Sequence, residues 1–389
     1  MKGAKESMKH IAIGQAGGPT AVINATLAAF VRALYKDHSL TFIRNGFEGL
    51  AKEKFLQASD NVIDNILAHE KVPGASLGAG RYTLSEEQIS QSVQVLQDLQ
   101  IDTLVFIGGN GTMEAMDKIK DEAIRQHYQL QLLGLPKTVD NDLAGTDHSP
   151  GFGSAARYVA QVTRDMGRDL LAMNNFEQVR IIETMGRNAG WLARASGFLK
   201  EYENDGPHFI ALPEKPLRPE ILFHHIKKAT RDYGVALIVV SEGVCLDKGS
   251  QIERERVNGH SVLGGISKEI ENKVNEHMNV MVRAELLGMN QRSCSASVSA
   301  TDYTEAIQVG SVGARWLREG ATDVMVSLQR SENTAYESVF TPVSLKTIVQ
   351  SGERKLPAKF LNDQAAYNEW LSPLIGYDLS SYPPPLQRR

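Results

Sequence analysis

Residues 104–112 read LVFIGGNGT and residues 132–142 read LLGLPKTVDND. Each stretch begins with an apolar run of strand length and then breaks into glycines or polar residues. Similar runs lie elsewhere along the chain, and helix-like segments separate several of them. The runs lie at 10–14, 179–182, 209–212, 235–240 and 324–328, and the helix-like segments include 21–34, 155–171 and 219–231. This alternation predicts an α/β protein with parallel sheets covered by helices.

Glycine-rich loops follow two of the predicted strands. The first is GQAGGPT at residues 14–20, and the second is GGNGT at residues 108–112. Glycines let backbone N–H groups approach an anion, and the N-terminus of the following helix adds partial positive charge. Neither loop ends in the Gly-Lys-Ser/Thr of a P-loop. One such loop can be a plain strand–helix connection, but two in one sheet favour a phosphate-binding site at the carboxyl ends of the strands.

A third loop, PKTVDND at residues 136–142, brings a lysine and two carboxylates together after a strand. Lys137 can neutralise phosphoryl oxygens, Asp140 can accept a hydroxyl proton, and Asp142 can hold Mg²⁺ or orient its neighbours. Phosphoryl transfer needs this combination of cation, base and metal. The alternative interpretation is a polar turn with an Asx cap.

The composition is that of an ordinary globular protein, with 42% hydrophobic and 23% charged residues among 389. The net charge of −4 gives no indication of a nucleic-acid partner. The two cysteines, Cys245 and Cys294, are too few for a disulfide framework and suit a reducing compartment. The opening MKGAKESMKHIAIG lacks the apolar region of a signal peptide, and no apolar run is long enough to span a membrane. We therefore expect a cytoplasmic protein without a membrane partner.

Four further motifs extend this pattern. They are GFGSAA at 151–156, MGRNAGWLA at 185–193, SEG at 241–243, and Arg283 followed by LGMNQR at 287–292. With the three loops in this order, the chain resembles the 6-phosphofructokinase family from about residue 9 to about residue 330. The resemblance implies the phosphofructokinase fold, which has two Rossmann-like lobes with parallel sheets facing across a cleft. It also implies phosphoryl transfer from ATP or pyrophosphate to the C1 hydroxyl of fructose 6-phosphate, a step of glycolysis.

The resemblance assigns roles to individual residues. Asp140 would be the general base, with Lys137 and Thr138 beside it in catalysis. The acceptor sugar would be bound by Thr138, Asp140, Met185, Gly186, Arg187, Glu242, Arg283, Met289 and Arg292. The donor would be bound by Gly17, Gly18, Arg81, Gly108, Gly109, Gly111 and Thr112, and Mg²⁺ by Asn110 and Asp142. One arginine of the family's sugar site comes from a neighbouring subunit, which implies a homodimer or homotetramer with shared active sites.

Three positions depart from the family pattern. Asn110 stands where the family has a metal-placing Asp, and Met289 stands where many ATP-using members have His. Gln178 stands where many members have an intersubunit Arg. Arg180, two residues on and on the same face of a strand, is a candidate substitute. These departures motivate a second hypothesis, a non-catalytic paralogue that binds sugar phosphates. A kinase of another sugar phosphate, such as sedoheptulose 7-phosphate, also stays open.

Two positions give opposite indications about the phosphoryl donor. Lys137 is typical of pyrophosphate-using members of the family. Gly111 occupies the position where those members have an Asp that repels the α-phosphate of a nucleotide, so this obstacle to ATP is absent. Together they leave a slight preference for ATP over pyrophosphate.

The lobes of this family exchange segments along the chain. We expect a donor lobe at residues 1–149 plus about 265–310, and a fructose 6-phosphate lobe at 150–264 plus about 311–345. Residues 346–389 are expected to form a C-terminal extension, whose end SSYPPPLQRR predicts an irregular tail.

Overall fold

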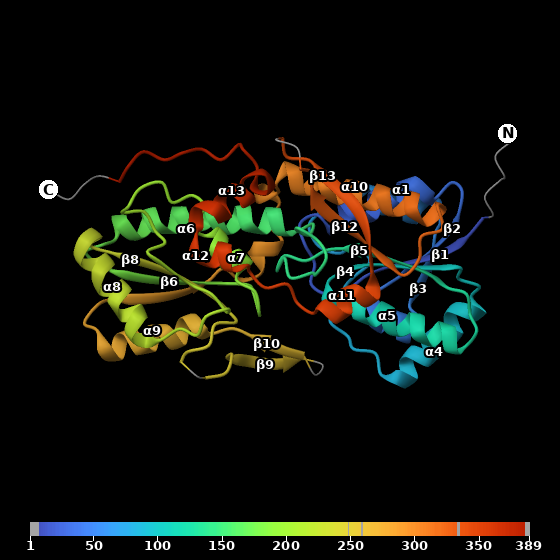
Figure 1. Ribbon diagram of the computed structural model, residues 1–389, viewed down its shortest axis with the longest axis horizontal. Coiled ribbons are helices and arrows are strands. Elements are labelled where there is room, and N and C mark those ends of the chain that lie inside the picture. Colours follow the sequence, from blue (N-terminus) through green and yellow to red (C-terminus); the bar gives the residue numbers. More distant parts are fainter. Residues whose placement is uncertain (1–7, 248, 258–259, 333–334, 386–389) are drawn as a thin grey trace. The chain divides into compact units, whose positions relative to one another are not determined.

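The computed structural model describes residues 8–385 except 248, 258–259 and 333–334 (Figure 1). The chain divides into two units, each made of two segments. The first unit comprises residues 1–151 and 300–354, and the second comprises 152–299 and 355–389. Both units contain parallel strands and helices, which confirms the predicted α/β class. Within the described residues, no helix is long and apolar enough to cross a membrane.

The first unit is built on a seven-stranded sheet in the order β13-β12-β5-β4-β1-β2-β3. Its strands pair in parallel, except that the edge strands β3 and β13 pair antiparallel with their neighbours. The strands are β1 (His10–Gln15), β2 (Ser39–Ile43), β3 (Phe55–Gln57), β4 (Thr103–Gly108), β5 (Gln131–Pro136), β12 (Val324–Arg330) and β13 (Ser338–Ser344). The helices are α1 (Ile23–Leu34), α2 (Gly46–Ala51), α3 (Asp60–Ala68), α4 (Glu86–Asp98), α5 (Asn110–Arg125), α10 (Ala300–Arg318) and α11 (Leu345–Ser351).

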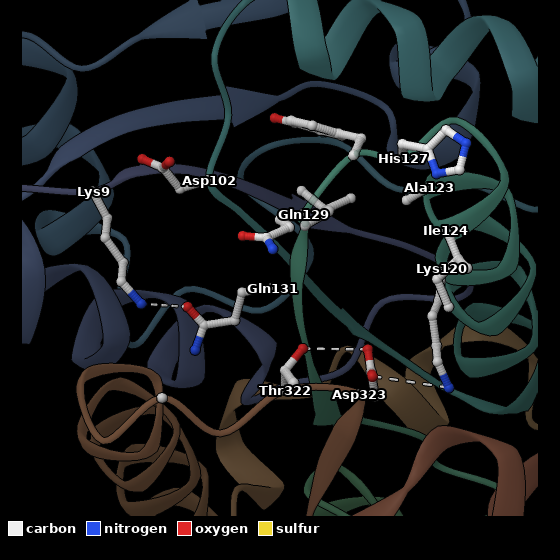
Figure 2. A pocket seen from close by; sticks show the side chains of 13 residues that line it. Lys9, Asp102, Lys120, Ala123, Ile124, His127, Gln129, Gln131, Thr322 and Asp323 are labelled. Atoms are coloured by element: carbon white, nitrogen blue, oxygen red, sulfur yellow. Dashed lines mark hydrogen bonds and ion pairs between the residues drawn. The ribbon is translucent and has the colours of Figure 1, made fainter.

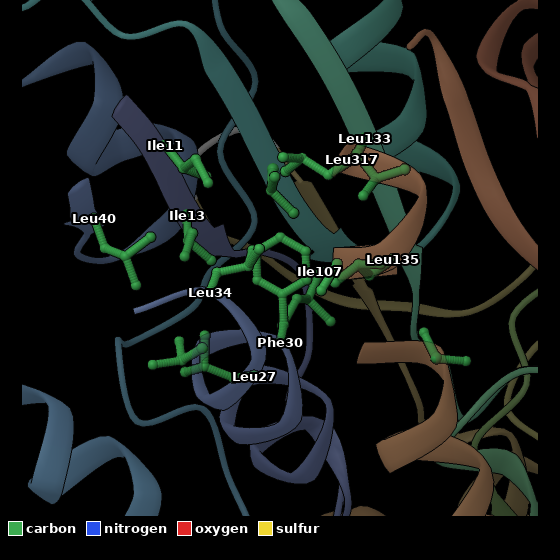
Figure 3. Close-up of a cluster of buried hydrophobic side chains, with 14 of the residues drawn as sticks. Ile11, Ile13, Leu27, Phe30, Leu34, Leu40, Ile107, Leu133, Leu135 and Leu317 are labelled. Atoms are coloured by element: carbon green, nitrogen blue, oxygen red, sulfur yellow. The ribbon is translucent and has the colours of Figure 1, made fainter. Parts of the chain in front are cut away.

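The sheet of the first unit lies between two buried apolar layers. Because successive side chains of a strand point to opposite faces, Ile11 and Ile13 of β1 join a cluster with α1 and α10, whereas Ala12 joins a cluster with α4 and α5. Figure 3 shows part of the first cluster, in which Phe30 of α1 lies among strand side chains. Burial on both faces explains why the central strands read as continuous apolar runs.

The second unit has a four-stranded parallel sheet in the order β11-β6-β8-β7 and an antiparallel hairpin of β9 and β10. The strands are β6 (Val179–Thr184), β7 (Phe209–Ala211), β8 (Ala236–Ser241), β9 (Glu253–Val257), β10 (His260–Leu263) and β11 (Val282–Leu286). The α-helices are α6 (Phe152–Ala172), α7 (Trp191–Ala195), α8 (Pro219–Tyr233), α9 (Ile266–His277), α12 (Ala358–Asn362) and α13 (Gln364–Ile375). Two short 3-10 helices are η1 (Gly288–Arg292) and η2 (Ser295–Ser297).

The C-terminal segment belongs to the core of the second unit. Tyr367 and Trp370 of α13 pack against Trp191 of α7, with ring centroids 6.3 and 4.9 Å away. The Tyr367 hydroxyl donates to the carbonyl oxygen of Trp191 at 2.6 Å. Residues 376–385 carry neither helix nor strand, in agreement with the predicted irregular tail, and residues 386–389 lie outside the described residues.

The two units exchange segments at positions that differ from the prediction. Residues 265–299 lie in the second unit rather than the first, because β11 pairs with β6 and α9 packs beside them. Residues 311–345 lie in the first unit rather than the second, because β12 pairs with β5. Residues 355–385 are an integral part of the second unit and not an extension added to it.

Gly310 marks a close approach of α10 to α1. A Cβ atom at this position would lie 2.3 Å from the carbonyl oxygen of Thr26, so the helices must move apart to admit a methyl group. We expect Gly310→Ala to lower the free energy of unfolding by roughly 1–3 kcal/mol in denaturant titrations. The exposed neighbour Ser311 provides the control, since Ser311→Ala should change stability by less than about 0.5 kcal/mol. Equal effects of the two substitutions would contradict the close approach.

Candidate active site

Three loops of the first unit follow the neighbouring parallel strands β1, β4 and β5 and emerge at one edge of the sheet. Gly17 has a φ of +79° and donates its N–H to the carbonyl oxygen of Gly80 at 3.0 Å. Gly109 is the N-cap residue of α5. Gly108 has no room for a side chain, because a Cβ atom would lie 2.0 Å from Thr112 Oγ1. The predicted donor glycines therefore lie in two adjacent loops beside a helix N-terminus.

Buried amides hold the segment that carries Arg81. Gln15 Oε1 accepts the N–H of Leu77 at 3.0 Å, and Asn24 Oδ1 accepts the N–H of Ser76 at 2.9 Å. Gln15 Nε2 also donates to Asn24 Oδ1 at 3.1 Å. Arg81 is exposed and follows the residue that accepts the hydrogen bond from the first glycine loop. Neither amide was predicted from the sequence, where its signal is a polar residue within an otherwise apolar strand or helix.

Lys137 joins all three loops. Only 3% of its surface is exposed, and its ammonium group donates to the carbonyl oxygen of Gly18 at 2.7 Å. The same ammonium lies 3.1 Å from the place that a Cβ atom on Gly17 would occupy. The backbone N–H of Lys137 donates to the carbonyl oxygen of Gly108 at 3.0 Å. A positive charge is thus placed next to glycine N–H groups, an arrangement suited to phosphoryl oxygens.

Hydrogen bonds within the loop that follows Lys137 fix the place of Asp140. Thr138 Oγ1 accepts the N–H of Asp140 at 3.1 Å. Asn141 has a φ of +54°, and its Oδ1 accepts the N–H of Ser149 at 3.1 Å. Asp140 itself is only partly buried, as a base that must reach a substrate has to be. The polar-turn interpretation therefore describes how this loop is held and is compatible with a catalytic Asp140.

Asp142 lies in a concentration of negative charge. Burial and the carboxylates of Asp140 and Glu353 raise the pKa of Asp142 to about 7. Asn110 Nδ2 donates to the backbone carbonyl oxygen of Asp142 at 3.0 Å. Among the described residues, no three His, Cys, Asp or Glu side chains form a complete metal site. These groups fit a Mg²⁺ ion that one or two carboxylates share with the phosphates of a substrate.

His148, near the end of this loop, is enclosed by two carboxylates. Its Nδ1 lies 2.9 Å from Asp147 and its Nε2 lies 2.7 Å from Glu305. Burial lowers the pKa of His148, but the charge of Glu305 and the hydrogen bond to Asp147 outweigh it and raise the pKa to about 9. Tyr336 donates to Glu305, and Arg330 pairs with Asp147 at 2.8 Å. The protonated imidazole thus ties the loop to α10 and β12.

A hollow of about 680 Å³ lies at the amino ends of the strands of the first unit's sheet, opposite the three loops (Figure 2). Its walls include Lys9, Asp102, Gln131 and Asp323, which precede or begin the strands β1, β4, β5 and β12. Lys9 Nζ donates to Gln131 Oε1 at 2.6 Å across this hollow. Of the predicted site residues, all of which are described, none lines it. The hollow is therefore separate from the three loops.

In the second unit, the loops after β6 and β8 interlock through close backbone contacts. Gly186 has a φ of +128°, and a Cβ atom there would lie 2.7 Å from Ser241 Oγ. Ser241 Oγ donates to the carbonyl oxygen of Gly186. A Cβ atom on Gly243 would lie 1.6 Å from the carbonyl oxygen of Arg187. The predicted acceptor residue Glu242, between Ser241 and Gly243, is thereby held beside Gly186 and Arg187.

Gln291 joins a third segment to the same edge of this sheet. Its Oε1 accepts the N–H of Met185 at 2.9 Å, and its Nε2 donates to the carbonyl oxygen of Gly288 at 2.9 Å. The next residue, Arg292, is partly buried, whereas Met289 is 59% exposed. The structure thus brings Arg292 next to the predicted sugar motif through a glutamine that the sequence analysis did not single out.

Glu214 supports the same motif and was also missed. Its Oε1 accepts the N–H of Gly190 and the N–H of Leu356, both at 3.0 Å. The contact links the motif at 185–193 to the C-terminal segment. Such a link leaves no local sequence signal, because its partners are far apart along the chain.

Arg283 lies apart from the other predicted acceptor residues of its unit. It pairs in register with Arg180 near the starts of β11 and β6. Met185 lies beyond the end of β6, five residues after Arg180 and thus roughly 16 Å along the strand. The structure therefore groups Met185, Gly186, Arg187, Glu242 and Arg292 but leaves Arg283 at the opposite end of the sheet.

Arg180 does not replace the arginine that the family has at position 178. Arg180 is only 5% exposed, and its Nε and Nη2 donate to the two carboxylate oxygens of Glu177 at 2.8 Å. Its Nη1 donates to Asp169 at 2.6 Å. Gln178 Oε1 instead accepts the N–H of Met281 at 2.9 Å and so joins the starts of β6 and β11. Arg180 is therefore excluded as the candidate substitute, because its guanidinium group is buried in ion pairs of its own.

Comparisons with known proteins bear on the whole chain. The sequence pattern of the family described as Phosphofructokinase matches residues 10–317. A sulfofructose kinase of Alkalicoccus urumqiensis is 44% identical over 94% of this chain and 95% of its own. A pyrophosphate–fructose 6-phosphate 1-phosphotransferase of Xanthomonas campestris pv. campestris (strain B100) is 31% identical over 90% of this chain and 87% of its own.

A solved structure is similar over almost the full length. The pyrophosphate-dependent phosphofructokinase from Marinobacter aquaeolei superposes with a TM-score of 0.83 and 28% sequence identity. The match covers 98% of this chain and 94% of that chain. The similarity confirms the predicted phosphofructokinase fold.

The protonated state of His148 predicts a stability that depends on pH. Its pKa rises from an ordinary value of about 6.5 to about 9 in the fold. The contribution of protonated His148 to the free energy of unfolding is therefore complete below about pH 6.5 and is lost as the pH rises through about 9. We expect His148→Gln to lower the free energy of unfolding on the order of 3 kcal/mol at pH 6 and by clearly less at pH 9.5.

Denaturant unfolding at both pH values measures this effect. The exposed His224 provides the control, because His224→Gln should leave stability nearly unchanged at either pH. A loss in His148→Gln that is the same at both pH values would contradict the protonated, doubly paired imidazole.

Proposed function

The chain belongs to the phosphofructokinase family, and we propose that it transfers a phosphoryl group from ATP to the C1 hydroxyl of a fructose that carries an anion at C6. The observation that carries the proposal is the loop of residues 137–142. In this loop a buried lysine contacts two glycine loops, and two carboxylates follow within five residues. Cation, base and metal-binding carboxylate are the groups that phosphoryl transfer needs.

In the proposed reaction, Asp140 accepts the proton of the C1 hydroxyl while the hydroxyl oxygen attacks the terminal phosphorus. The bond from that phosphorus to its bridging oxygen breaks, and the shortened donor leaves. The hydrogen bond from the Asp140 N–H to Thr138 fixes the direction of this loop. Lys137 and the N–H groups of the glycine loops offset negative charge on the donor phosphates.

Asn110 and Asp142 are the proposed Mg²⁺ residues of this chain. When bound, Mg²⁺ neutralises charge on the phosphoryl oxygens. The raised pKa of Asp142 reflects a repulsion between carboxylates that a cation would relieve. Asn110 can offer an oxygen but no charge, so the ion would depend on Asp142 and on the donor phosphates.

ATP is the proposed donor, with pyrophosphate as the second candidate. A Cβ atom on Gly111 would meet no other atom within 4 Å, so the surroundings of this position are open. Gly111 has no carboxylate that would repel the α-phosphate of a nucleotide. Pyrophosphate stays a candidate because of Lys137 and because the relative from Xanthomonas campestris is named for it.

The proposed acceptor is a fructose with a sulfonate at C6, with fructose 6-phosphate as the second candidate. The relative that is 44% identical is named a sulfofructose kinase. A sulfonate carries one negative charge, whereas a phosphate monoester carries roughly 1.5 to 2 at neutral pH. Gln178 and Met289 stand where other members have an arginine and a histidine, and this loss weakens a site for a dianion more than a site for a monoanion.

A homo-oligomer is part of the proposal. Arg283 lies at the opposite end of its sheet from Met185, yet the family resemblance makes it a ligand of the C6 anion. A second copy that supplies its Arg283 would complete the acceptor site. This arrangement supports shared active sites in a homodimer or homotetramer.

Removal of the proposed base tests the reaction. We expect Asp140→Asn to lower kcat by roughly 100-fold or more, with a smaller change in KM, because the hydroxyl proton loses its acceptor. Initial rates with ATP, Mg²⁺ and each of the two acceptors measure the effect. Asp64→Asn, an exposed substitution on α3, should leave kcat unchanged. Undiminished turnover by the Asp140 variant would remove Asp140 from the role.

A carboxylate introduced at position 111 tests the donor. Because a Cβ atom there meets no neighbour within 4 Å, Gly111→Asp should fold normally and change only the charge beside the donor. We expect kcat/KM for ATP to fall about tenfold or more and kcat/KM for pyrophosphate to change little. Gly111→Asn is the matched neutral control and should retain more activity with ATP. A wild type that uses only pyrophosphate and is insensitive to both substitutions would refute the choice of ATP.

A further inference from the structure

One buried carboxylate lies beside an arginine that the proposed acceptor site uses. Glu177 is 4% exposed, and its Oε2 lies 3.9 Å from Nε of Arg283. The Arg283 side chain is 52% exposed and is thus open to an anion. No step of the proposed reaction uses Glu177. It is nevertheless the carboxylate that pairs with Arg283, a predicted ligand of the C6 anion.

The four groups of the ion-pair network that includes Arg283 carry no net charge. Arg180 donates to both oxygens of Glu177 and also to Asp169, so one guanidinium faces two carboxylates. These three groups carry one net negative charge, and Arg283 brings the sum of the four to zero. Gln178 adds no charge, and its side-chain oxygen accepts the N–H of Met281. An anion that binds Arg283 therefore meets a positive charge that the neighbouring ion pairs already neutralise.

This balance affects a phosphate more than a sulfonate. Both groups present several oxygens to a guanidinium, so their hydrogen bonds to Arg283 are alike. The repulsion by Glu177 grows in proportion to the charge of the anion, and a phosphate monoester above pH 7 has nearly twice the charge of a sulfonate. Because Glu177 is buried, dissolved salt screens its charge less than that of a surface carboxylate.

We infer that Glu177 is a specificity-determining residue that favours a sulfonate over a phosphate at C6 of the acceptor by limiting the positive charge at Arg283. The inference rests on the proposed function, because it takes Arg283 as a ligand of the C6 anion. Glu177 acts through Arg283 and is not expected to touch the reacting atoms.

The direct test compares kcat/KM for fructose 6-phosphate and for its 6-sulfonate counterpart in wild type and in Glu177→Gln. The ratio of phosphate to sulfonate should rise roughly tenfold in the variant, through KM rather than kcat. The glutamine can still accept a hydrogen bond from Arg180. Asp169→Asn is the matched control, because it also removes one carboxylate that contacts Arg180, but Asp169 is not paired with Arg283. The ratio of phosphate to sulfonate should change less in this variant than in Glu177→Gln. An unchanged ratio in Glu177→Gln, or an equal shift in Asp169→Asn, overturns the inference.

A measurement on the unaltered protein covers the case in which Glu177→Gln fails to fold. Fructose 6-phosphate loses its second charge below about pH 6, whereas a sulfonate keeps one charge throughout. In the wild type, the ratio of kcat/KM for the sulfonate to kcat/KM for the phosphate should therefore fall as the pH is lowered from 8 to 5.5. Titration of the catalytic groups acts on both acceptors and cancels in the ratio. The charged groups that face Arg283 are Glu177 directly and, through Arg180, Asp169.

The outcomes separate the inference from the proposed function. A wild type that prefers the phosphate at pH 8, or a ratio that stays constant with pH, overturns the role of Glu177 while the phosphotransferase activity stands. Turnover of neither acceptor overturns the proposed function and the inference with it.

Discussion

A buried ammonium group holds together the three loops of the first unit that are proposed to bind the donor. Lys137 contacts the carbonyl oxygen of Gly18 through its side chain and that of Gly108 through its backbone N–H. The side chain fills the space beside Gly17, and this close approach explains why the loop after β1 has glycine there. Burying a positive charge is unfavourable unless oxygens surround it, so the loops after β1, β4 and β5 are built around one cation. A phosphate of the proposed donor would add the negative charge that this arrangement accommodates.

The strands and the polar or glycine-rich loops that follow them could be predicted because their signals are local. Apolar runs such as residues 104–107 are continuous because both faces of the sheet are buried, and the polar loops follow them directly. The segment exchange and the role of residues 355–385 could not be predicted, since they depend on contacts such as Tyr367 with Trp191. The same limit explains the error at Arg180, whose place on a strand was visible but whose burial against Glu177 was not.

The two units build their proposed ligand-binding sites by different means. The first unit uses side chains with buried charge, namely Lys137, Asp142 and the enclosed His148. The second unit relies on backbone contact, since Gly186 and Gly243 lie too close to their neighbours to carry a side chain. A backbone framework tolerates changes in the side chains that project from it. Such a framework is consistent with a family in which named relatives of this chain act on different sugars.

The division of the chain has a consequence for its synthesis on the ribosome. The chain passes from one unit to the other after residues 151, 299 and 354. When residue 299 has emerged, the first unit still lacks β12, which pairs with β5 in its sheet, and the second still lacks α12 and α13. Neither unit can complete its core before its last segment arrives. Both units therefore stay incomplete until their last segments, 300–354 and 355–389, have been made. Until then, the partly made chain exposes two unfinished apolar surfaces, which are prone to aggregation.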